Sequence, residues 1–297
     1  MFPYYGAKSK IAPWIFQNFD LQGINNYVEP FSGSFKVYLH PKNDFSSVKN
    51  VVYNDIYLPN CNVFTCAQDP HEFQKTVFEA FMEGGLLFCK GKGSYDDIYA
   101  NYKDFFYNYK KDIKPLDNPT LGDSDYEAAL IYLFLVYSAF NAKHFKKAGY
   151  KERNKYTTTA RRFKMLTPLW NNLRDDKLMD KIARINKISA DDFTVVMKDY
   201  NSPDTFLYLD PPYVGREKKY DYENTGVFTE NHHKILADLV KESNAKICIS
   251  YYPSPKIDEY YPKPRFRYES KKVRDSSSGK IEDEILIMNY PKILDEK

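Results

Sequence analysis

The stretch "FLYLDPPYVG", residues 206–215, decides how the rest of the chain is interpreted. An apolar run from Phe206 to Leu209 ends at a carboxylate, Asp210, and two prolines follow before Tyr213. Such a run is typical of a buried strand. In open α/β sheets, ligands bind beyond the carboxyl ends of the strands. The stretch therefore predicts an α/β fold with a functional residue at Asp210.

The residues Asp210, Pro211, Pro212 and Tyr213 offer hydrogen-bond acceptors without competing donors. Proline has no N–H and a fixed φ, so the carbonyl between the two prolines points in a defined direction. An exocyclic amine on a flat ring, such as N6 of adenine, needs two acceptors around it, and a tyrosine ring offers a face for stacking. The alternative is a Pro-Pro turn in which Asp210 is an ordinary turn acid.

Composition sets broad limits on the whole protein. The 297 residues are 43% hydrophobic and 28% charged, with a formal charge of +3, as in ordinary soluble proteins. The four cysteines show no C-x-x-C pair and are too few for a disulfide scaffold, so we expect reduced thiols, no metal site and a cytoplasmic protein. The longest nearly apolar run, residues 128–140, is shorter than the roughly 20 residues of a membrane-spanning helix. It predicts a core helix, and no membrane partner is expected.

The chain divides by pattern into a sheet part and a helical insertion. Residues 1–66 and 171–297 predict one α/β domain, and residues 67–170 predict an inserted, mostly helical domain. Strand patterns alternate with helix patterns in the first part, and its end reads as an antiparallel hairpin. The expected strands lie at residues 25–31, 48–55, 192–197, 205–210 and 245–252, and a helix is expected at 229–243.

Three further motifs carry candidate site residues. In "VEPFSGSF" (28–35), Glu29 precedes a turn of small residues that would let a ligand approach the backbone. In "YNDIY" (53–57), Asp55 ends a strand where an acid can accept from two ribose hydroxyls; its alternative is a helix N-cap. In "YYGAKSK" (4–10), Lys8 is a cation suited to hold a carboxylate; the alternative is a solvated N-terminus.

A basic segment follows the predicted core helix. Residues 141–164 hold six lysines, three arginines and one acid, with aromatic residues between them. Basic groups spaced by aromatics suit contact with nucleic-acid phosphates, whereas a basic run alone is usually a solvated loop. The residues predicted to contact DNA are Lys143, Lys146, Lys147, Lys151, Arg153, Lys155, Arg161 and Arg162.

Together the motifs "YYGAK", "VEPFSG", "ND" and "DPPY", in this order and with a helical insertion before the last, resemble the D12-class, Dam-type DNA adenine-N6 methyltransferases in the α arrangement. The resemblance covers residues 4 to about 252. It implies a Rossmann-like methyltransferase sheet with a terminal antiparallel hairpin and a helical target-recognition domain. The chain departs from the family pattern at Phe35, where a second glycine is usual, and after the core helix, so no target sequence carries over.

The resemblance also implies roles for particular residues. Tyr4, Tyr5, Gly6 and Lys8 would line the methionine end of S-adenosylmethionine, and Asp55 would hold its ribose. The cofactor loop would consist of Glu29, Pro30, Phe31, Ser32 and Gly33. Asp199, after the expected strand at 192–197, would reach the cofactor's adenine. Asp210 and the Pro211 carbonyl would bind the target amine, with Asp210 also beside the cofactor and Tyr213 stacked on the base.

The expected function is methylation of adenine N6, in a base rotated out of duplex DNA. An N4-cytosine methyltransferase and a catalytically inactive DNA-binding relative are the alternatives. The resemblance also allows a cognate restriction endonuclease as partner, in a bacterial or phage setting, and we expect a monomer or a weak dimer.

Overall fold

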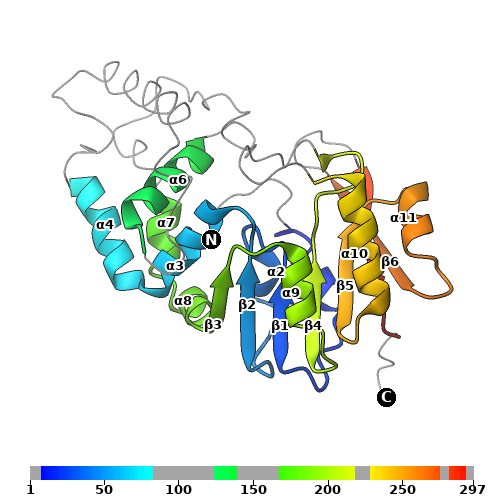
Figure 1. The fold of residues 1–297 in the computed structure, drawn as a ribbon. Coiled ribbons are helices and arrows are strands. Elements are labelled where there is room, and N and C mark those ends of the chain that lie inside the picture. The colour runs from blue at the N-terminus through cyan, green and yellow to red at the C-terminus, as the bar shows by residue number, and fades with distance from the viewer. Residues whose placement is uncertain (1–7, 83–123, 139–166, 218–227, 275–280, 292–297) are drawn as a thin grey trace. The chain divides into compact units, whose positions relative to one another are not determined.

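The computed structural model describes residues 8–82, 124–138, 167–217, 228–274 and 281–291. The chain forms two compact units. One comprises residues 1–7 and 58–183, and the other comprises residues 8–57 and 184–297. The second unit holds the whole sheet, and Figure 1 shows its strands side by side with helices across them. No helix within the described ranges is long and apolar enough to cross a membrane.

A mixed sheet of seven strands, in the order β3-β2-β1-β4-β5-β7-β6, forms the second unit. Strands β1 to β5 are parallel to one another, and β7 runs antiparallel to β5 and to β6. The first strand, β1, therefore pairs with β4, which follows the whole first unit in sequence. The strands are β1 (Asn26–Glu29), β2 (Asn50–Asn54), β3 (Ile185–Ser189), β4 (Thr205–Leu209), β5 (Lys246–Tyr251), β6 (Arg267–Arg274) and β7 (Ile281–Met288).

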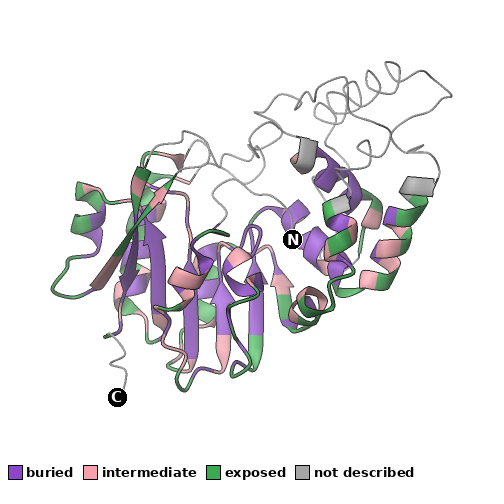
Figure 2. Ribbon diagram, turned by 180° about the vertical axis from the view of Figure 1, so that it is seen from behind, coloured by how far each residue is buried: buried purple, intermediate pink, exposed green. Residues whose placement is uncertain are grey.

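The two faces of this sheet bury different side chains. One face is mainly aliphatic: Val28, Leu207 and Ile247 pack in one cluster with helices α9 (Phe193–Asp199) and α10 (Glu230–Glu242). The other face is aromatic. Tyr27 and Phe206 lie there among Phe19, Tyr38 and Phe45, which come from the segments around α1 (Ala12–Phe16) and α2 (Lys36–Leu39). Because side chains alternate along a strand, the consecutive buried residues of β1 and β4 cover both faces. Figure 2 shows buried strands at the centre of the sheet.

The strand predicted at residues 192–197 is wrong, because this segment is the helix α9. Asp192 caps it: its carboxylate accepts the backbone N–H of Thr194 at 2.8 Å. The buried Phe193, Val196 and Met197 have helical spacing. The strand of this region lies earlier, at β3. It was missed because it is an edge strand, with Asn186 and Lys187 exposed in its middle.

The described part of the first unit is helical. Its buried helix α6 (Tyr126–Ser138) confirms the core helix predicted from residues 128–140. Polar contacts join α6 to α3: the Tyr132 hydroxyl donates to Asn60 at 2.6 Å, and the Asn62 amide donates to the Asp125 carbonyl at 2.8 Å. The other helices described are α3 (Leu58–Gln68), α4 (Pro70–Met82), α7 (Thr167–Asn172) and α8 (Asp176–Ala183). The last helix of the second unit is α11 (Pro255–Tyr260).

Candidate active site

The carboxyl ends of the adjacent strands β1 and β4 bring Glu29 and Asp210 to the same edge of the sheet. The register pairs Val28 with Leu207, and Glu29 ends β1 whereas Asp210 directly follows β4. Glu29 is buried and accepts the Tyr27 hydroxyl at 2.5 Å. Its burial raises its pKa well above the ordinary value. Glu29 therefore belongs to the aromatic face, whereas Asp210, with 22% of its side chain exposed, is open to a ligand.

Asp210 lies in a cluster of four charged or polar groups. The Lys8 ammonium is 3.1 Å from Asp210 Oδ1 and 3.1 Å from Glu284 Oε1. It also donates to the Tyr213 hydroxyl at 2.6 Å, and that hydroxyl donates to Glu284. An ammonium has three N–H donors, and these three acceptors surround it. The segment before α1, the loop after β4 and strand β7 therefore meet at one lysine.

The pKa of Asp210 is raised from its ordinary value of 3.8 to about 6. Burial is the main cause. The Lys8 ammonium opposes it, and the negative charge of Glu284 adds to it. Burial, followed by the charges of Asp210 and Glu284, raises the pKa of Tyr213 well above 10. The ionised Asp210 is therefore a stronger base than an ordinary aspartate.

The loop after β4 turns tightly around Tyr213. The Tyr213 carbonyl accepts the N–H of Arg216 at 2.8 Å, and Gly215 has a φ of 79°. The Tyr213 ring is 4% exposed and meets the Tyr252 ring edge to face, with centroids 4.6 Å apart. Arg216 lies over the other tyrosine of this pair, 4.4 Å from the Tyr252 centroid, and binds Glu282 at 2.5 Å. The Tyr213 ring is thus covered by Tyr252, which directly follows β5, and Tyr252 is covered in turn by Arg216.

Hydrogen bonds join the loop after β1 to the end of β2. The Gly33 N–H donates to Asp55 Oδ2 at 2.7 Å, and the Gly33 carbonyl accepts the Tyr53 hydroxyl at 2.7 Å. Gly33 has a φ of 50°, a conformation that glycine adopts without strain. Ser32 donates to the Glu29 carbonyl at 2.7 Å, which closes the turn. The backbone of this loop is therefore fixed before any ligand arrives.

Phe35 has a left-handed backbone, with φ 54° and ψ 34°, at the N-cap of α2. Among the described residues other than glycine, Phe35 alone has a positive φ. Its side chain is fully buried and packs on Tyr38 and Tyr53, with ring centroids 4.7 and 5.2 Å away. The loop thus has the geometry that glycine favours, and the buried ring compensates for the backbone strain.

The family model described as D12 class N6 adenine-specific DNA methyltransferase matches residues 4–276. This match covers both the N-terminal loop and the residues after β4. The chain belongs to this family. A search among curated proteins gives no match.

Membership makes the chain an adenine-specific DNA methyltransferase, and duplex or single-stranded DNA is therefore its substrate class. It disfavours the N4-cytosine alternative. The structure brings Lys8, Asp210 and Tyr213 of this methyltransferase together. Lys8, expected to hold a carboxylate, does so, but the carboxylates are the protein's own Asp210 and Glu284. A contact of Lys8 with the methionine end of the cofactor stays a prediction.

Asp55 is buried at the end of β2, and both its oxygens accept backbone N–H groups. Oδ2 accepts from Gly33 and Oδ1 from Tyr57, at 2.7 and 2.8 Å. The helix α3 begins at Leu58, so Asp55 is not its N-cap. A bond of Asp55 to the cofactor ribose stays a prediction.

Asn54 belongs to the quoted motif "ND", but its role in this methyltransferase was not predicted from the sequence. The Asn54 side chain, fully buried, donates to the carbonyls of Pro30 and Asp191, both at 3.0 Å. Its oxygen accepts from the Ser189 hydroxyl at 2.7 Å and the Asp191 N–H at 2.9 Å. One amide thus joins the loops that follow β1, β2 and β3. The signal was its place beside Asp55, at a strand end otherwise rich in valine.

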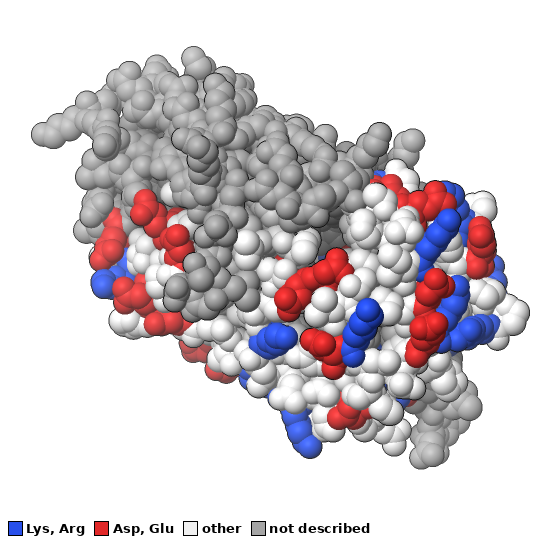
Figure 3. Space-filling view, in the orientation of Figure 1, with Lys and Arg blue, Asp and Glu red and all other residues white. Residues whose placement is uncertain are grey.

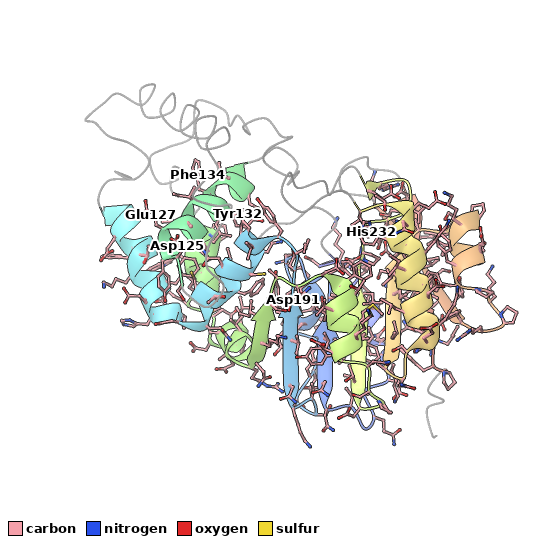
Figure 4. All side chains as sticks on the ribbon, in the orientation of Figure 1. Asp125, Glu127, Tyr132, Phe134, Asp191 and His232 are labelled. Atoms are coloured by element: carbon pink, nitrogen blue, oxygen red, sulfur yellow. The ribbon has the colours of Figure 1, made fainter. Side chains whose placement is uncertain are left out.

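Aromatic rings gather beside these loops. Phe31 lies 5.3 Å from Phe193 and 5.9 Å from Phe228, between ring centroids, and Phe193 is 5.7 Å from Phe228. His232, at the start of α10, is 5.1 Å from Phe228. Figure 4 labels His232 at the start of α10 and Asp191 in the loop before α9. Phe31 was predicted from its motif, whereas Phe193 was hidden in the segment misassigned as a strand.

The remaining predicted residues divide into two groups. Asp199 is exposed at the last position of α9 instead of following a strand, and its contact with the cofactor stays a prediction. Asp191 and Asp192 are the acids that follow β3. Tyr4, Tyr5, Gly6 and the eight basic DNA-contact candidates lie outside the described residues. On the face drawn in Figure 3, the described lysines and arginines stand among acids.

Proposed function

We propose that this chain transfers the methyl group of S-adenosylmethionine to N6 of an adenine that is rotated out of duplex DNA. The observation that carries the proposal is the pairing of Asp210 with Lys8 at the carboxyl end of β4, followed by two residues without an N–H. The Asp210 carboxylate is thus a negatively charged hydrogen-bond acceptor at the carboxyl edge of the sheet, where open α/β sheets bind ligands. The family match supports the same reaction.

The carboxyl edge of β1 to β3 has the chemistry that this cofactor requires. The rings of Phe31, Phe193 and Phe228 offer a site for a purine, since aromatic faces stack favourably. The carboxylates of Asp55 and Asp191 supply acceptors for hydroxyl and amino groups. The Gly33 turn brings the backbone close without a side chain. When bound, S-adenosylmethionine supplies an electrophilic methyl group on a sulfonium sulfur.

Asp210 and the Pro211 carbonyl would hold the two N6 protons of the target adenine. Both are acceptors, and the absence of an N–H on Pro211 and Pro212 removes competing donors. The N6 lone pair forms the new C–N bond, the C–S bond pair stays on sulfur, and one N6 proton passes to Asp210. With a pKa of about 6, Asp210 is ionised at neutral pH and able to receive this proton.

The target base would stack on Tyr213, which requires a neighbouring ring to move. Tyr213 is 4% exposed, and its edge-to-face partner Tyr252 is half-buried. Enzymes that act on a base extrude it into a pocket at a cost of a few kcal/mol. Displacement of Tyr252 would open the ring of Tyr213 to the incoming base. The basic residues between 143 and 162 would bind the flanking phosphates, and residues 67–170 would recognise the target sequence.

A methyl-transfer assay tests the proposal. With labelled S-adenosylmethionine and unmethylated genomic DNA, we expect Asp210→Ala to abolish transfer and Asp210→Asn to keep a trace, because an amide oxygen still accepts. Asp204→Ala is the matched control, since Asp204 lies at the opposite end of the same strand. It should keep its rate per folded molecule. Activity of Asp210→Ala within a few-fold of the parent would refute the assignment.

Expression in a methylation-free bacterial host, followed by mapping of modified bases, identifies the site and the base. N6-methyladenine at one sequence is expected. The absence of any modified base would favour an inactive DNA-binding relative.

Base rotation is tested by the affinity of the protein for DNA with a mismatched target adenine, which should exceed its affinity for DNA with the paired adenine. A cognate endonuclease, a bacterial or phage host and a monomeric or weakly dimeric state stay part of this proposal.

A further inference from the structure

Glu284 belongs to the site although it is far in sequence from every family motif. It lies on β7, is 3% exposed, and is the first of five consecutive buried residues on that strand, the other four being apolar. A buried carboxylate costs several kcal/mol unless it is paired. Its partners are the Lys8 ammonium, at 3.1 Å, and the Tyr213 hydroxyl. Both partners also serve Asp210 or the target base in the proposed function.

We propose that Glu284 is a positioning residue for methyl transfer: through Lys8 and Tyr213 it keeps Asp210 available as the acceptor of the N6 proton. This inference rests on the proposed function of Asp210. Two carboxylates share one ammonium, so Lys8 neutralises only part of the charge on each. The hydroxyl of Tyr213, fixed between Lys8 and Glu284, holds the ring beside Asp210.

The alternative arrangement shows what Glu284 contributes. Without its charge, Lys8 would pair with Asp210 alone, and this one-to-one ion pair would stabilise the ionised form of Asp210. An opposite charge within about 4–6 Å lowers a carboxyl pKa, and a like charge raises it. Lys8 and Glu284 act on the Asp210 pKa in these two opposite directions. Glu284 therefore makes Asp210 a stronger base than the ion pair alone would.

Other groups around the cluster are neutral or engaged elsewhere. Tyr208 and Tyr251 are buried phenols with pKa values raised well above 10 by burial, and burial likewise raises that of Tyr252. Arg216 is bound to Glu282 at the edge of the site. The titratable and charged groups that face Asp210 or Glu284 are Lys8, Glu29, Tyr208, Tyr213, Arg216, Tyr251, Tyr252 and Glu282.

The substitution Glu284→Gln tests the inference, because it keeps the shape and an acceptor oxygen but removes the charge. Single-turnover methyl transfer is measured from pH 5 to 9, and the ¹³Cγ signal of labelled aspartates is titrated, with Asp210→Asn giving the assignment. We expect the acid limb of the rate and the Asp210 titration to move together to lower pH by about one unit. Glu284→Asp, which keeps the charge, should restore most of this shift.

Asp283→Asn is the matched control. Asp283 is the exposed neighbour of Glu284 on the same strand, and its substitution removes the same charge. It should leave both titrations where they are in the parent. If the profiles of Glu284→Gln and Asp283→Asn coincide, Glu284 is only structural and the inference is overturned. If the parent shows no titration of Asp210 that tracks its acid limb, the proposed role of Asp210 fails, and this inference fails with it.

Discussion

Replacement of Phe35 separates the strain of its backbone from the packing of its ring. Truncation of a fully buried phenylalanine to alanine costs about 3–5 kcal/mol, and the buried ring of Phe35 meets two other rings. Alanine keeps the left-handed strain, because a β-carbon remains. Glycine removes it, and a left-handed conformation costs other residues about 1–2 kcal/mol. Phe35→Gly should therefore be less destabilised than Phe35→Ala, by roughly 1 kcal/mol.

The order of the two variants is the decisive result. Glycine in a strand or helix is usually worse than alanine by about 0.5–1 kcal/mol. The control is Phe206, which is equally buried but lies in the regular strand β4. There, Phe206→Gly should be less stable than Phe206→Ala. Urea unfolding followed by circular dichroism gives both differences. A Phe35→Gly variant less stable than Phe35→Ala would show that the backbone at position 35 is not left-handed.

Three other perturbations have defined outcomes. Asp210 binds a proton more tightly in the folded protein, with a pKa of about 6 against 3.8. The free energy of unfolding should therefore fall as the pH rises from about 4 to 6, by up to roughly 3 kcal/mol. Thermal melts at several pH values should show that Asp210→Asn lacks this fall and is the more stable protein at pH 7. Asn54→Ala removes the side chain that bonds the Ser189 hydroxyl, the Asp191 N–H and the carbonyls of Pro30 and Asp191. In calorimetry it should lower the affinity for S-adenosylmethionine more than the affinity for DNA. Equal losses of the two affinities would refute the role of Asn54 in the loops. Neutralising four basic residues to glutamine should make the salt dependence of DNA binding shallower, by roughly one unit of slope per lost phosphate contact, with cofactor affinity unchanged; an unchanged slope would make the segment a solvated loop. The four residues are Lys146, Lys147, Arg161 and Arg162.

The strands at the centre of the sheet were predictable because each is a short run of mostly buried residues. β1, β2, β4 and β5 all have this form, and β1, β2 and β4 also end at or directly before a polar residue, Glu29, Asn54 and Asp210. β3 was not predictable, because it is an edge strand in which only some positions are buried and apolar. The segment Thr194-Val195-Val196 was mistaken for a strand because β-branched residues favour strands, whereas the Asp192 cap and the burial of Phe193 decided for a helix.

The candidate site was predictable where it is local in sequence and not where it is assembled by the fold. Asp210 and Tyr213 belong to one motif, but 205 residues separate Lys8 from Tyr213, and 71 separate Tyr213 from Glu284. A lone glutamate in an otherwise apolar strand was the signal for Glu284. Only the antiparallel pairing of β7 with β5 brings it beside Lys8. The four contacts of Asn54 likewise depend on three strand ends meeting at one edge.

The order of strands has a consequence for synthesis of the protein. On one side β1 pairs with β2, which lies 24 residues later in the chain. On its other side β1 pairs with β4, and Asn26 and Thr205 of these strands are 179 residues apart. At 5–20 residues per second, a ribosome takes about 10–35 s to make that length. During this time, β1 offers an apolar edge open to other nascent chains, while the helices of the first unit emerge and form local contacts. A release of the chain before residue 205 should therefore give aggregates, and the yield of native enzyme in cells should depend on holdase chaperones more than its final stability suggests.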